Sequence, residues 1–346
     1  MAEINIRAKR KDEHLDRSIA FQDPSPSPFR EIKLIRRALP ETCLETVDTH
    51  TTLFGKALDF PLIIEAMTGG TERSKKINEG LAQIASSLNI GLALGSCSIV
   101  ADNPGAIISF AIAREANPDG LIIANCSPTT PIEAISQTLD ATRANALQIH
   151  INAVQEMAMK EGDRDFRWWN NILAIRKNFN LPIIVKEVGF GIDRDTAKLL
   201  TSKGIMIDLG GSGGTDFAAI ENERAGTSEC SEVSTIGLTT PESLIEMQSV
   251  PGAAFIASGG IRTPLDILKC LSLNALAVGI ANPVLKAFEA RGLKGTLEYL
   301  SDLIQKTRQL ICLFGCQNIR SCQNIDKVFT GDLRDFQLQR KGTKIR

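Results

Sequence analysis

The chain has almost no net charge. Its 39 lysine and arginine residues are balanced by 40 aspartate and glutamate residues, which leaves a formal net charge of −1 at pH 7. No global basic field therefore exists that could hold nucleic acid or an anionic membrane surface. An anionic ligand must be bound by local groups, and we expect the partner to be a small molecule.

Long apolar runs and paired cysteines are also missing. No segment approaches the ~20 apolar residues of a membrane-spanning helix, and the N-terminus is polar where a signal peptide needs an apolar core. The eight cysteines contain no C-x-x-C pair, and such usage suits reduced thiols. We therefore expect an unexported, cytoplasmic protein.

Residues 1–60 are expected to form an N-terminal arm and lead-in that contribute to the substrate site. The charged piece RAKRKDEHLD is followed by DPSPSPF, whose prolines favour an extended arm over a packed helix. Arginine and lysine are suited to phosphate oxygens, so the arm could fold over a pocket and supply cations. The alternative is that this mixed run of charges is a solvated face.

From Pro61 onward, short apolar runs alternate with helical patterns. The expected strands are 61–67, 91–95, 121–125, 147–151, 182–188, 205–209, 253–259 and 275–280. The expected helices are 72–88, 104–116, 131–144, 166–178, 193–203, 240–249, 264–272, 283–291 and 294–314. Strands that are apolar almost throughout and alternate with helices indicate an α/β fold, a (β/α)8 TIM barrel over 61–346, more than an open doubly wound sheet. The polar segment 216–239 interrupts the alternation and is expected to be a loop inserted after strand six.

The catalytic groups of a barrel lie at the C-terminal ends of its strands. In this chain those ends are polar or glycine, and they include the run Gly210 to Gly214, the pair Gly259-Gly260, and Gly279. Glycines let backbone N–H groups approach an anion closely. These turns are expected to bind a phosphate group, although flexible turns have a similar composition.

The stretch LQIHINAVQE concentrates polar groups where a strand ends. Apolar and polar residues alternate through His150, and Asn152, Gln155 and Glu156 follow within a few residues. Buried polar groups need partners, and a ligand would satisfy several at once. His150 alone could equally be a core histidine.

Lys186 interrupts the apolar strand PIIVKEV. A lysine in a barrel mouth must meet an anion or change its pKa. It could stabilise negative charge at the pyrimidine edge of a flavin, and FMN would explain both this lysine and the phosphate turns. The alternative is a structural ion pair with Glu187 or Asp208.

The chain resembles the type 2 isopentenyl-diphosphate isomerases, a family of FMN-dependent barrels. The motifs that carry the resemblance are RKDEH at 10–14, AMTGG at 66–70, GLALGS at 91–96, HINAVQE at 150–156, VKEVGFG at 185–191, GGSGGT at 210–215 and ASGGIR at 257–262. The family converts isopentenyl diphosphate to dimethylallyl diphosphate by a 1,3-allylic proton shift. It needs reduced FMN, for which NADPH is the expected reductant, and Mg²⁺.

The resemblance assigns roles by position. FMN would be surrounded by Ala66, Met67, Thr68, Ser96, Asn125, Lys186, Thr215, Gly259, Gly260, Ile261, Ile280 and Ala281. The substrate would be bound by Arg10, Lys11, His150, Asn152 and Gln155, with Gln155 acting in catalysis beside the reduced flavin, and Glu156 would bind Mg²⁺. The resemblance also implies a homo-oligomer, a tetramer or an octamer.

Two positions depart from the family pattern, because Ser98 and Asn282 stand where arginines are usual. Each missing charge-assisted contact would weaken diphosphate binding by roughly 1.5–3 kcal/mol. Two alternatives therefore stay open. One is an FMN-dependent oxidoreductase of the 2-hydroxy-acid type, which would need a histidine base and an arginine pair near strand seven, and the other is a flavin-binding homologue with reduced turnover.

Overall fold

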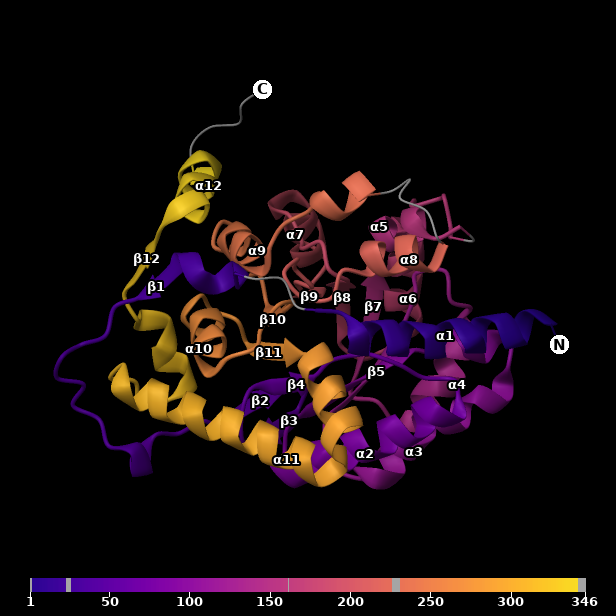
Figure 1. The fold of residues 1–346 in the computed structure, drawn as a ribbon, viewed down its shortest axis with the longest axis horizontal. Helices are drawn as coiled ribbons and strands as arrows, with labels where there is room; N and C mark the ends of the chain where they lie inside the picture. Colours follow the sequence, from indigo (N-terminus) through magenta and orange to yellow (C-terminus); the bar gives the residue numbers. More distant parts are fainter. Residues whose placement is uncertain (1, 23–25, 161, 226–230, 342–346) are drawn as a thin grey trace.

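The fold is a closed barrel of eight parallel strands, in the spatial order β10-β11-β4-β5-β6-β7-β8-β9 (Figure 1). The computed structural model describes residues 2–22, 26–160, 162–225 and 231–341, and at residues 2–10, 225, 231, 234 and 341 it describes the backbone alone. The barrel strands are β4 (Leu62–Ile64), β5 (Gly91–Ser96), β6 (Ile122–Cys126), β7 (Ala146–Ile151), β8 (Ile183–Glu187), β9 (Met206–Asp208), β10 (Phe255–Ser258) and β11 (Ala277–Ile280). The expected (β/α)8 barrel is confirmed.

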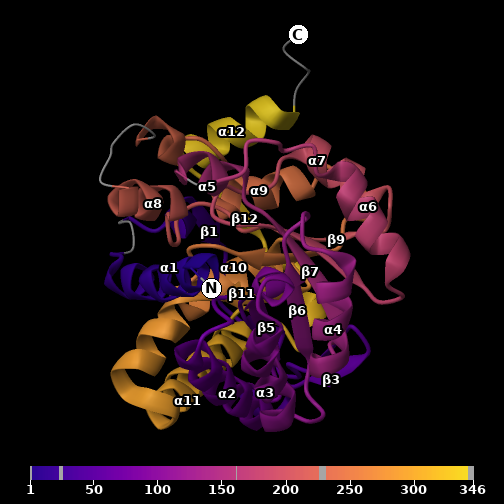
Figure 2. The same ribbon diagram turned by 90° about the vertical axis from the view of Figure 1, so that its right-hand side faces the viewer.

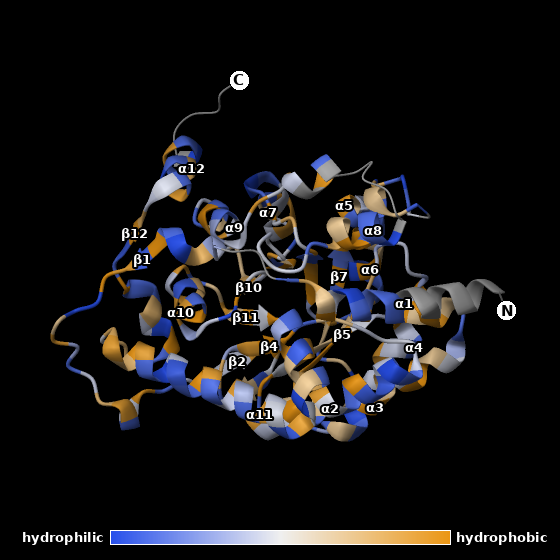
Figure 3. Ribbon diagram, in the orientation of Figure 1, coloured by the Kyte–Doolittle hydropathy of each residue, from blue (hydrophilic) through white to orange (hydrophobic). Residues whose placement is uncertain are grey.

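Helices surround the barrel on the outside (Figure 2). They are α2 (Glu72–Leu88), α3 (Ile108–Ala116), α4 (Ile132–Thr142), α5 (Ala153–Ala158), α6 (Trp169–Asn178), α7 (Arg194–Thr201), α9 (Thr240–Met247), α10 (Pro264–Ser272) and α11 (Asn282–Leu313). Short 3-10 helices are η1 (Pro28–Glu31), η2 (Leu44–Thr46), η3 (Cys97–Ala101), η4 (Pro104–Ile107), η5 (Ser231–Thr235) and η6 (Ile319–Asn324). Figure 3 shows hydrophobic and hydrophilic residues alternating along α11, as expected of a helix with one buried face. No described helix is long and apolar enough to span a membrane.

The strands form because their residues are apolar on both faces. Every residue of β4, β6 and β8 is buried, as in other parallel sheets covered by helices. The hairpin of β2 (Thr51–Leu53) and β3 (Lys56–Leu58) packs Leu53 and Leu58 against Ile63 and Leu121, near the starts of their strands. The hairpin therefore closes the N-terminal end of the barrel, which leaves the C-terminal end for a site.

Two expectations about the elements need correction. The charged N-terminal piece lies in a helix, α1 (Ala2–Ala20), which packs beside α8 and α11 rather than being part of an extended arm. The segment 216–239 is not simply a loop, since it contains α8 (Phe217–Ala225) and η5. The two helices expected after strand eight are confirmed, because the backbone of α11 is non-helical at Gly292, with φ 63° and ψ −167°, which lies between them.

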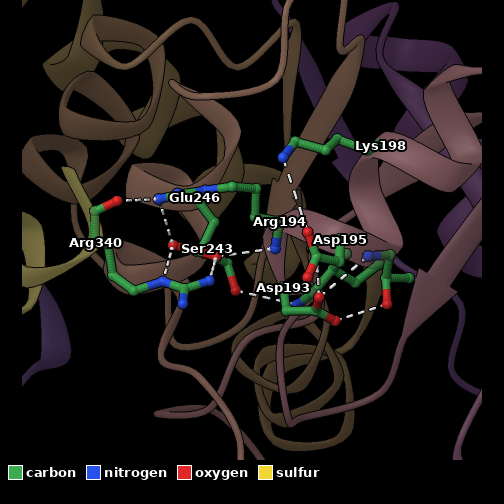
Figure 4. A network of polar contacts seen from close by, with 9 residues as sticks. Asp193, Arg194, Asp195, Lys198, Ser243, Glu246 and Arg340 are labelled. Atoms are coloured by element: carbon green, nitrogen blue, oxygen red, sulfur yellow. Dashed lines mark hydrogen bonds and ion pairs between the residues drawn. The ribbon is translucent and has the colours of Figure 1, made fainter. Parts of the chain in front are cut away.

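The C-terminal segment ties the N-terminal lead-in to the barrel. Strand β1 (Ile32–Leu34) pairs antiparallel with β12 (Lys327–Phe329), and α12 (Gly331–Lys341) follows. The Arg340 side chain binds both oxygens of the buried Glu246 on α9, at 2.7 and 2.5 Å, and Arg194 binds the same carboxylate (Figure 4). Burial opposes ionisation of Glu246, but the hydrogen bonds from Arg340 and Arg194 outweigh it and lower its pKa.

This anchored lead-in reaches the glycine turns of the barrel mouth. A Cβ atom on Gly213 would lie 2.5 Å from the Cγ of Pro28, so the proline ring lies directly against that turn. Lys269 on α10 holds the same segment, because its Nζ donates to the Phe29 carbonyl at 2.9 Å. Residues 26–34 therefore form one wall of the mouth.

Candidate active site

Two adjoining cavities of about 170 and 510 Å³ open at the C-terminal ends of the strands. They share Gly189, Gly214 and Thr215 in their walls. Most residues expected to surround FMN line the smaller cavity, namely Ala66, Met67, Lys186, Thr215, Gly259, Gly260, Ile261, Ile280 and Ala281. Thr68, Ser96 and Asn125 are expected flavin residues that do not line it.

The glycine turns after β9 and β10 pack backbone against backbone. Gly259 has φ +100°, and a Cβ there would lie 2.1 Å from the Gly211 carbonyl oxygen. A Cβ on Gly214 would lie 2.8 Å from the Gly260 nitrogen. No side chain fits at these positions, so backbone groups can approach a ligand that a Cβ would keep away. This geometry suits a phosphate group.

A buried chain of side-chain hydrogen bonds crosses the barrel below the mouth. His150 Nδ1 lies 2.8 Å from Asn125 Oδ1, and Asn125 Nδ2 donates to Gln148 Oε1 at 2.7 Å. Gln148 Nε2 then donates to Asp208 Oδ2 at 2.9 Å. Burial lowers the pKa of His150 to about 4, with a smaller effect from the Lys11 cation. The imidazole is therefore neutral near pH 7 and can both donate and accept a hydrogen bond.

Lys186 is the centre of a buried charged cluster. Its Nζ lies 3.3 Å from Asp208 Oδ2 and 3.5 Å from Glu65 Oε2, and it donates to Ser258 Oγ at 3.0 Å. Burial disfavours the ammonium ion, but the Asp208 and Glu65 carboxylates outweigh this effect and raise the pKa of Lys186. The ion pair with Asp208 exists, so the structural interpretation is confirmed. Lys186 lines the cavity as well, and its contact with a flavin stays a prediction.

The polar residues after β7 form one turn of helix α5. Asn152 Nδ2 donates to Glu156 Oε1 at 3.0 Å, and the Asp163 backbone N–H donates to Glu156 Oε2 at 2.9 Å. Gln155 Nε2 donates to Glu221 Oε1 at 3.1 Å, which connects α5 to α8. Within the described residues no group of three histidine, cysteine or acidic side chains could hold a metal ion. A cation at Glu156 would therefore need oxygen atoms of a ligand or of water.

Helix α1 brings the N-terminal motif over the mouth. Lys11 Nζ donates to the Ser96 carbonyl at 2.9 Å and lies 5.8 Å from the centre of the Phe110 ring. His14, Leu15 and Ser18 line the smaller cavity. The side chain of Arg10 lies outside the described residues, so its expected role stays a prediction.

Sequence reasoning did not assign Glu221 or His14 to the site. Glu221 Oε1 lies 2.7 Å from His14 Nε2, and its Oε2 lies 2.7 Å from Arg224 Nε. Burial opposes ionisation of Glu221, but the bonds from His14, Arg224 and Gln155 outweigh it and lower its pKa to about 2. Glu221 thus joins α1, α5 and α8 around the mouth. His14 closes the RKDEH motif, which was a signal for it, whereas Glu221 lies in a segment expected to be a loop.

The two departures from the family pattern have different surroundings. Ser98 Oγ lies 2.8 Å from both Ser96 Oγ and Thr130 Oγ1, so the side chain at position 98 is surrounded by hydroxyl groups. Asn282 is 6% exposed and lines the cavity, and neither Oδ1 nor Nδ2 has a hydrogen-bond partner among the described residues. Buried polar atoms are rarely left without partners, so the Asn282 amide is available to a ligand.

Comparison with known proteins shows the family. The family described as FMN-dependent dehydrogenase matches residues 123–326. An isopentenyl-diphosphate delta-isomerase of Listeria monocytogenes serovar 1/2a is 41% identical over 95% of this chain and 93% of its own length. An isopentenyl-diphosphate delta-isomerase of Limosilactobacillus reuteri is 40% identical over 96% of this chain and 97% of its own length.

Solved structures confirm the fold alone. A mandelate oxidase with 3,3-difluoro-2-hydroxy-3-phenylpropionic acid has a TM-score of 0.65 at 18% identity, over 95% of this chain and 99% of that one. The identity of about 40% to the two isomerases over nearly the full length decides the relationship. The chain belongs to the isopentenyl-diphosphate delta-isomerase family and carries an FMN-dependent dehydrogenase domain.

Proposed function

We propose that this protein converts isopentenyl diphosphate to dimethylallyl diphosphate by a 1,3-allylic proton shift. The observation that carries the proposal is that the polar turn after β7, helix α1 and the glycine turns converge on one mouth. Gln155 binds Glu221, Glu221 binds His14, and His14 lines the same cavity as Lys186, Gly259 and Gly260. The glycine turns could therefore bind the phosphate group of FMN while the residues of α1 and α5 bind the substrate diphosphate at the same mouth.

The cavity residues fit FMN. The Gly259-Gly260 turn has no room for a side chain and suits the flavin phosphate, and the buried Lys186 cation suits the negative edge of the ring. Reduced FMN would supply the acid and base for the proton shift, and NADPH is the proposed reductant. Thr68, Ser96 and Asn125 do not line the cavity and would act on the ligands indirectly. Asn125 Oδ1 contacts His150 Nδ1, and the Ser96 carbonyl accepts a hydrogen bond from Lys11.

The substrate residues would hold the diphosphate at the other side of the mouth. Lys11 would supply a cation and the Asn152 amide a donor. Neutral His150 donates Nδ1–H to Asn125 Oδ1, so its Nε2 would accept a hydrogen bond from water bound at the diphosphate. Arg10 would add a second cation. Mg²⁺ commonly binds proteins through one or two carboxylates together with phosphate oxygens and water, and the Glu156 carboxylate fits that donor set. Gln155, which donates to Glu221, would orient the isoprenoid chain and hold the proton-transfer geometry.

The assay uses purified protein with FMN, NADPH, Mg²⁺ and isopentenyl diphosphate in the absence of oxygen. We expect dimethylallyl diphosphate to accumulate without stoichiometric consumption of NADPH, because the reaction involves no net oxidation. Stoichiometric consumption of NADPH would instead indicate the oxidoreductase alternative, and bound flavin without product would indicate a homologue that has lost turnover. We further propose that the protein acts in the cytoplasm as a homo-oligomer, a tetramer or an octamer, which sedimentation equilibrium can test.

Replacing Asn282 with alanine tests whether its unpartnered amide serves the ligand. The apo protein should keep its melting temperature or gain slightly, because the change removes two buried polar atoms that have no partner. FMN should bind roughly 5- to 10-fold more weakly, which corresponds to one neutral hydrogen bond of about 1 kcal/mol. Fluorescence titration with FMN and thermal unfolding of the apo protein measure the two effects. A destabilised apo protein with unchanged FMN affinity would contradict this role.

A further inference from the structure

The neighbourhood of Lys186 contains a second carboxyl group that no role yet explains. Glu65 follows directly after β4 and is 2% exposed. It lines the smaller cavity, and its Oε1 atom has no hydrogen-bond partner among the described residues. Its other oxygen, Oε2, accepts a hydrogen bond from the Ala66 backbone N–H at 3.3 Å. One oxygen of a buried carboxyl group is therefore left without a partner at the wall of the flavin cavity.

A glycine in the neighbouring strand leaves room for the Glu65 side chain. A Cβ atom on Gly279, in the adjacent strand β11, would lie 2.3 Å from Glu65 Oε1 and 2.6 Å from its Cγ. Any residue other than glycine at 279 would displace the Glu65 carboxyl group. Glycine within a strand often marks such a close approach.

The charges around Glu65 do not balance when it is ionised. The charged groups that act on it are Asp208 on β9 and Lys186 on β8, and Glu187 acts on Lys186 from the same strand. Burial raises the pKa of Glu187 to about 8, so this carboxyl group is largely neutral near pH 7. Lys186 and Asp208 neutralise each other, so an ionised Glu65 leaves the cluster with one negative charge, whereas a protonated Glu65 leaves it neutral. Burial, with a further contribution from the Asp208 carboxylate, raises the pKa of Glu65 to about 7. The group can therefore change its protonation state near neutral pH.

We propose that Glu65 takes up a proton from solvent when the bound flavin is reduced, and so frees the Lys186 cation to compensate the charge of the reduced ring. This inference rests on the proposed function, because it needs FMN in this cavity. Two electrons and one proton from the reductant, NADPH or dithionite with water, leave the flavin with one additional negative charge. The Glu65 carboxylate then binds one solvent proton to become a carboxylic acid. The site gains two electrons and two protons, and its net charge is unchanged.

Glu65 is a positioning residue in this account, since it acts on the flavin through Lys186. The expected consequence is a pH dependence of the flavin midpoint potential. For a two-electron couple each proton taken up contributes about 29.6 mV per pH unit. Above pH 7, where Glu65 is ionised before reduction, the wild-type slope should be about 59 mV per pH unit. Below that range Glu65 is already protonated, and the slope should fall toward about 30 mV per pH unit.

The test measures the midpoint potential of the FMN-loaded protein between pH 6 and pH 9 for the wild type and for Glu65→Gln. Above pH 7 the glutamine variant should show a slope about 30 mV per pH unit smaller than the wild type, because it cannot bind the proton that Glu65 takes up. The control variant Glu298→Gln changes an exposed glutamate on α11 and should behave as the wild type. Equal slopes in the wild type and Glu65→Gln would overturn the proposal.

A second measurement needs no variant and covers the case in which Glu65→Gln does not fold. Dithionite reduction of the wild-type protein at pH 8 in weak buffer, followed with a pH-indicator dye and corrected for the protons of dithionite oxidation, counts the protons taken up per flavin. Two protons are expected, and one proton would overturn the proposal. Failure to bind FMN at all would instead overturn the proposed function, so the two failures can be told apart.

Discussion

Replacing Glu156 with glutamine is expected to lower Mg²⁺-dependent turnover of isopentenyl diphosphate by roughly 100-fold, which corresponds to about 3 kcal/mol for one contact to a charged group. Glutamine keeps the size of the side chain but removes the negative charge that a hard divalent cation needs. Steady-state kinetics over a range of Mg²⁺ concentrations should show a raised Mg²⁺ requirement. The flavin absorbance spectrum should not change, because Glu156 does not line the cavity of the expected flavin residues.

The matched control for this change is Glu115→Gln, which alters an exposed glutamate on α3 and should leave the kinetics as they are. Glu156 also accepts hydrogen bonds from Asn152 and from the Asp163 backbone, so a structural role is the competing explanation. A variant that loses flavin or melts at a much lower temperature would support that explanation instead.

Replacing Lys186 with methionine is expected to have the largest effect on stability. The change removes the cation shared by Asp208 and Glu65 and leaves two buried carboxyl groups without it. Removing one partner of a buried ion pair typically costs about 3–5 kcal/mol. For a chain of this size, thermal unfolding of the apo protein should show a melting temperature lower by roughly 4–7 °C. FMN affinity and turnover should fall as well.

The loss of stability in Lys186→Met should grow as the pH rises. The folded-state pKa of Glu65 is already about 7, above its ordinary value of 4.5, and without the lysine it should rise further. A group whose pKa is raised by folding loses its contribution to stability as the pH rises from the unfolded to the folded pKa. The difference in melting temperature from the wild type should therefore be larger at pH 8 than at pH 6. The control is Lys186→Arg, which keeps the positive charge. If Lys186→Arg melted at the same low temperature as Lys186→Met, the shape of the side chain and not its charge would account for the loss of stability.

The barrel could be predicted because its strands have a strong local signal. The runs at 121–125 and 182–188 are apolar except for Asn125, Lys186 and Glu187 near their ends, and the structure has β6 and β8 there with every residue buried. Helix α10 begins at Pro264, the first residue of the expected range 264–272, and Thr263 caps it, whereas Thr239 rather than the adjacent Thr240 caps α9. A cap depends on one hydrogen bond, here from the Glu242 backbone N–H to Thr239, so two adjacent threonines cannot be distinguished by composition.

Elements with a weak local pattern could not be predicted. Helix α8 consists of the apolar run FAAI followed by the polar run ENER and has no one-sided apolar pattern. Its buried residues, Ala218, Ile220 and Glu221, become buried only against neighbouring elements. The pairing of β1 with β12 joins residues almost 300 positions apart. No pattern within either three-residue strand specifies the other, because such pairing depends on the closed chain as a whole.

The candidate site also has features that could be predicted from the sequence and features that could not. The residues around the mouth could be predicted because parallel strands in a barrel all end on one side, so that His150, Lys186 and the glycine turns had to meet once the strands were known. The amino-acid sequence by itself therefore determined the architecture, the family and the chemical groups at the mouth. Which groups pair was decided by the tertiary structure alone. The distances from Lys186 to Glu65 and from Glu221 to His14 depend on neighbouring strands and on helices that pack across the barrel, and these contacts have no counterpart in any local stretch of the chain.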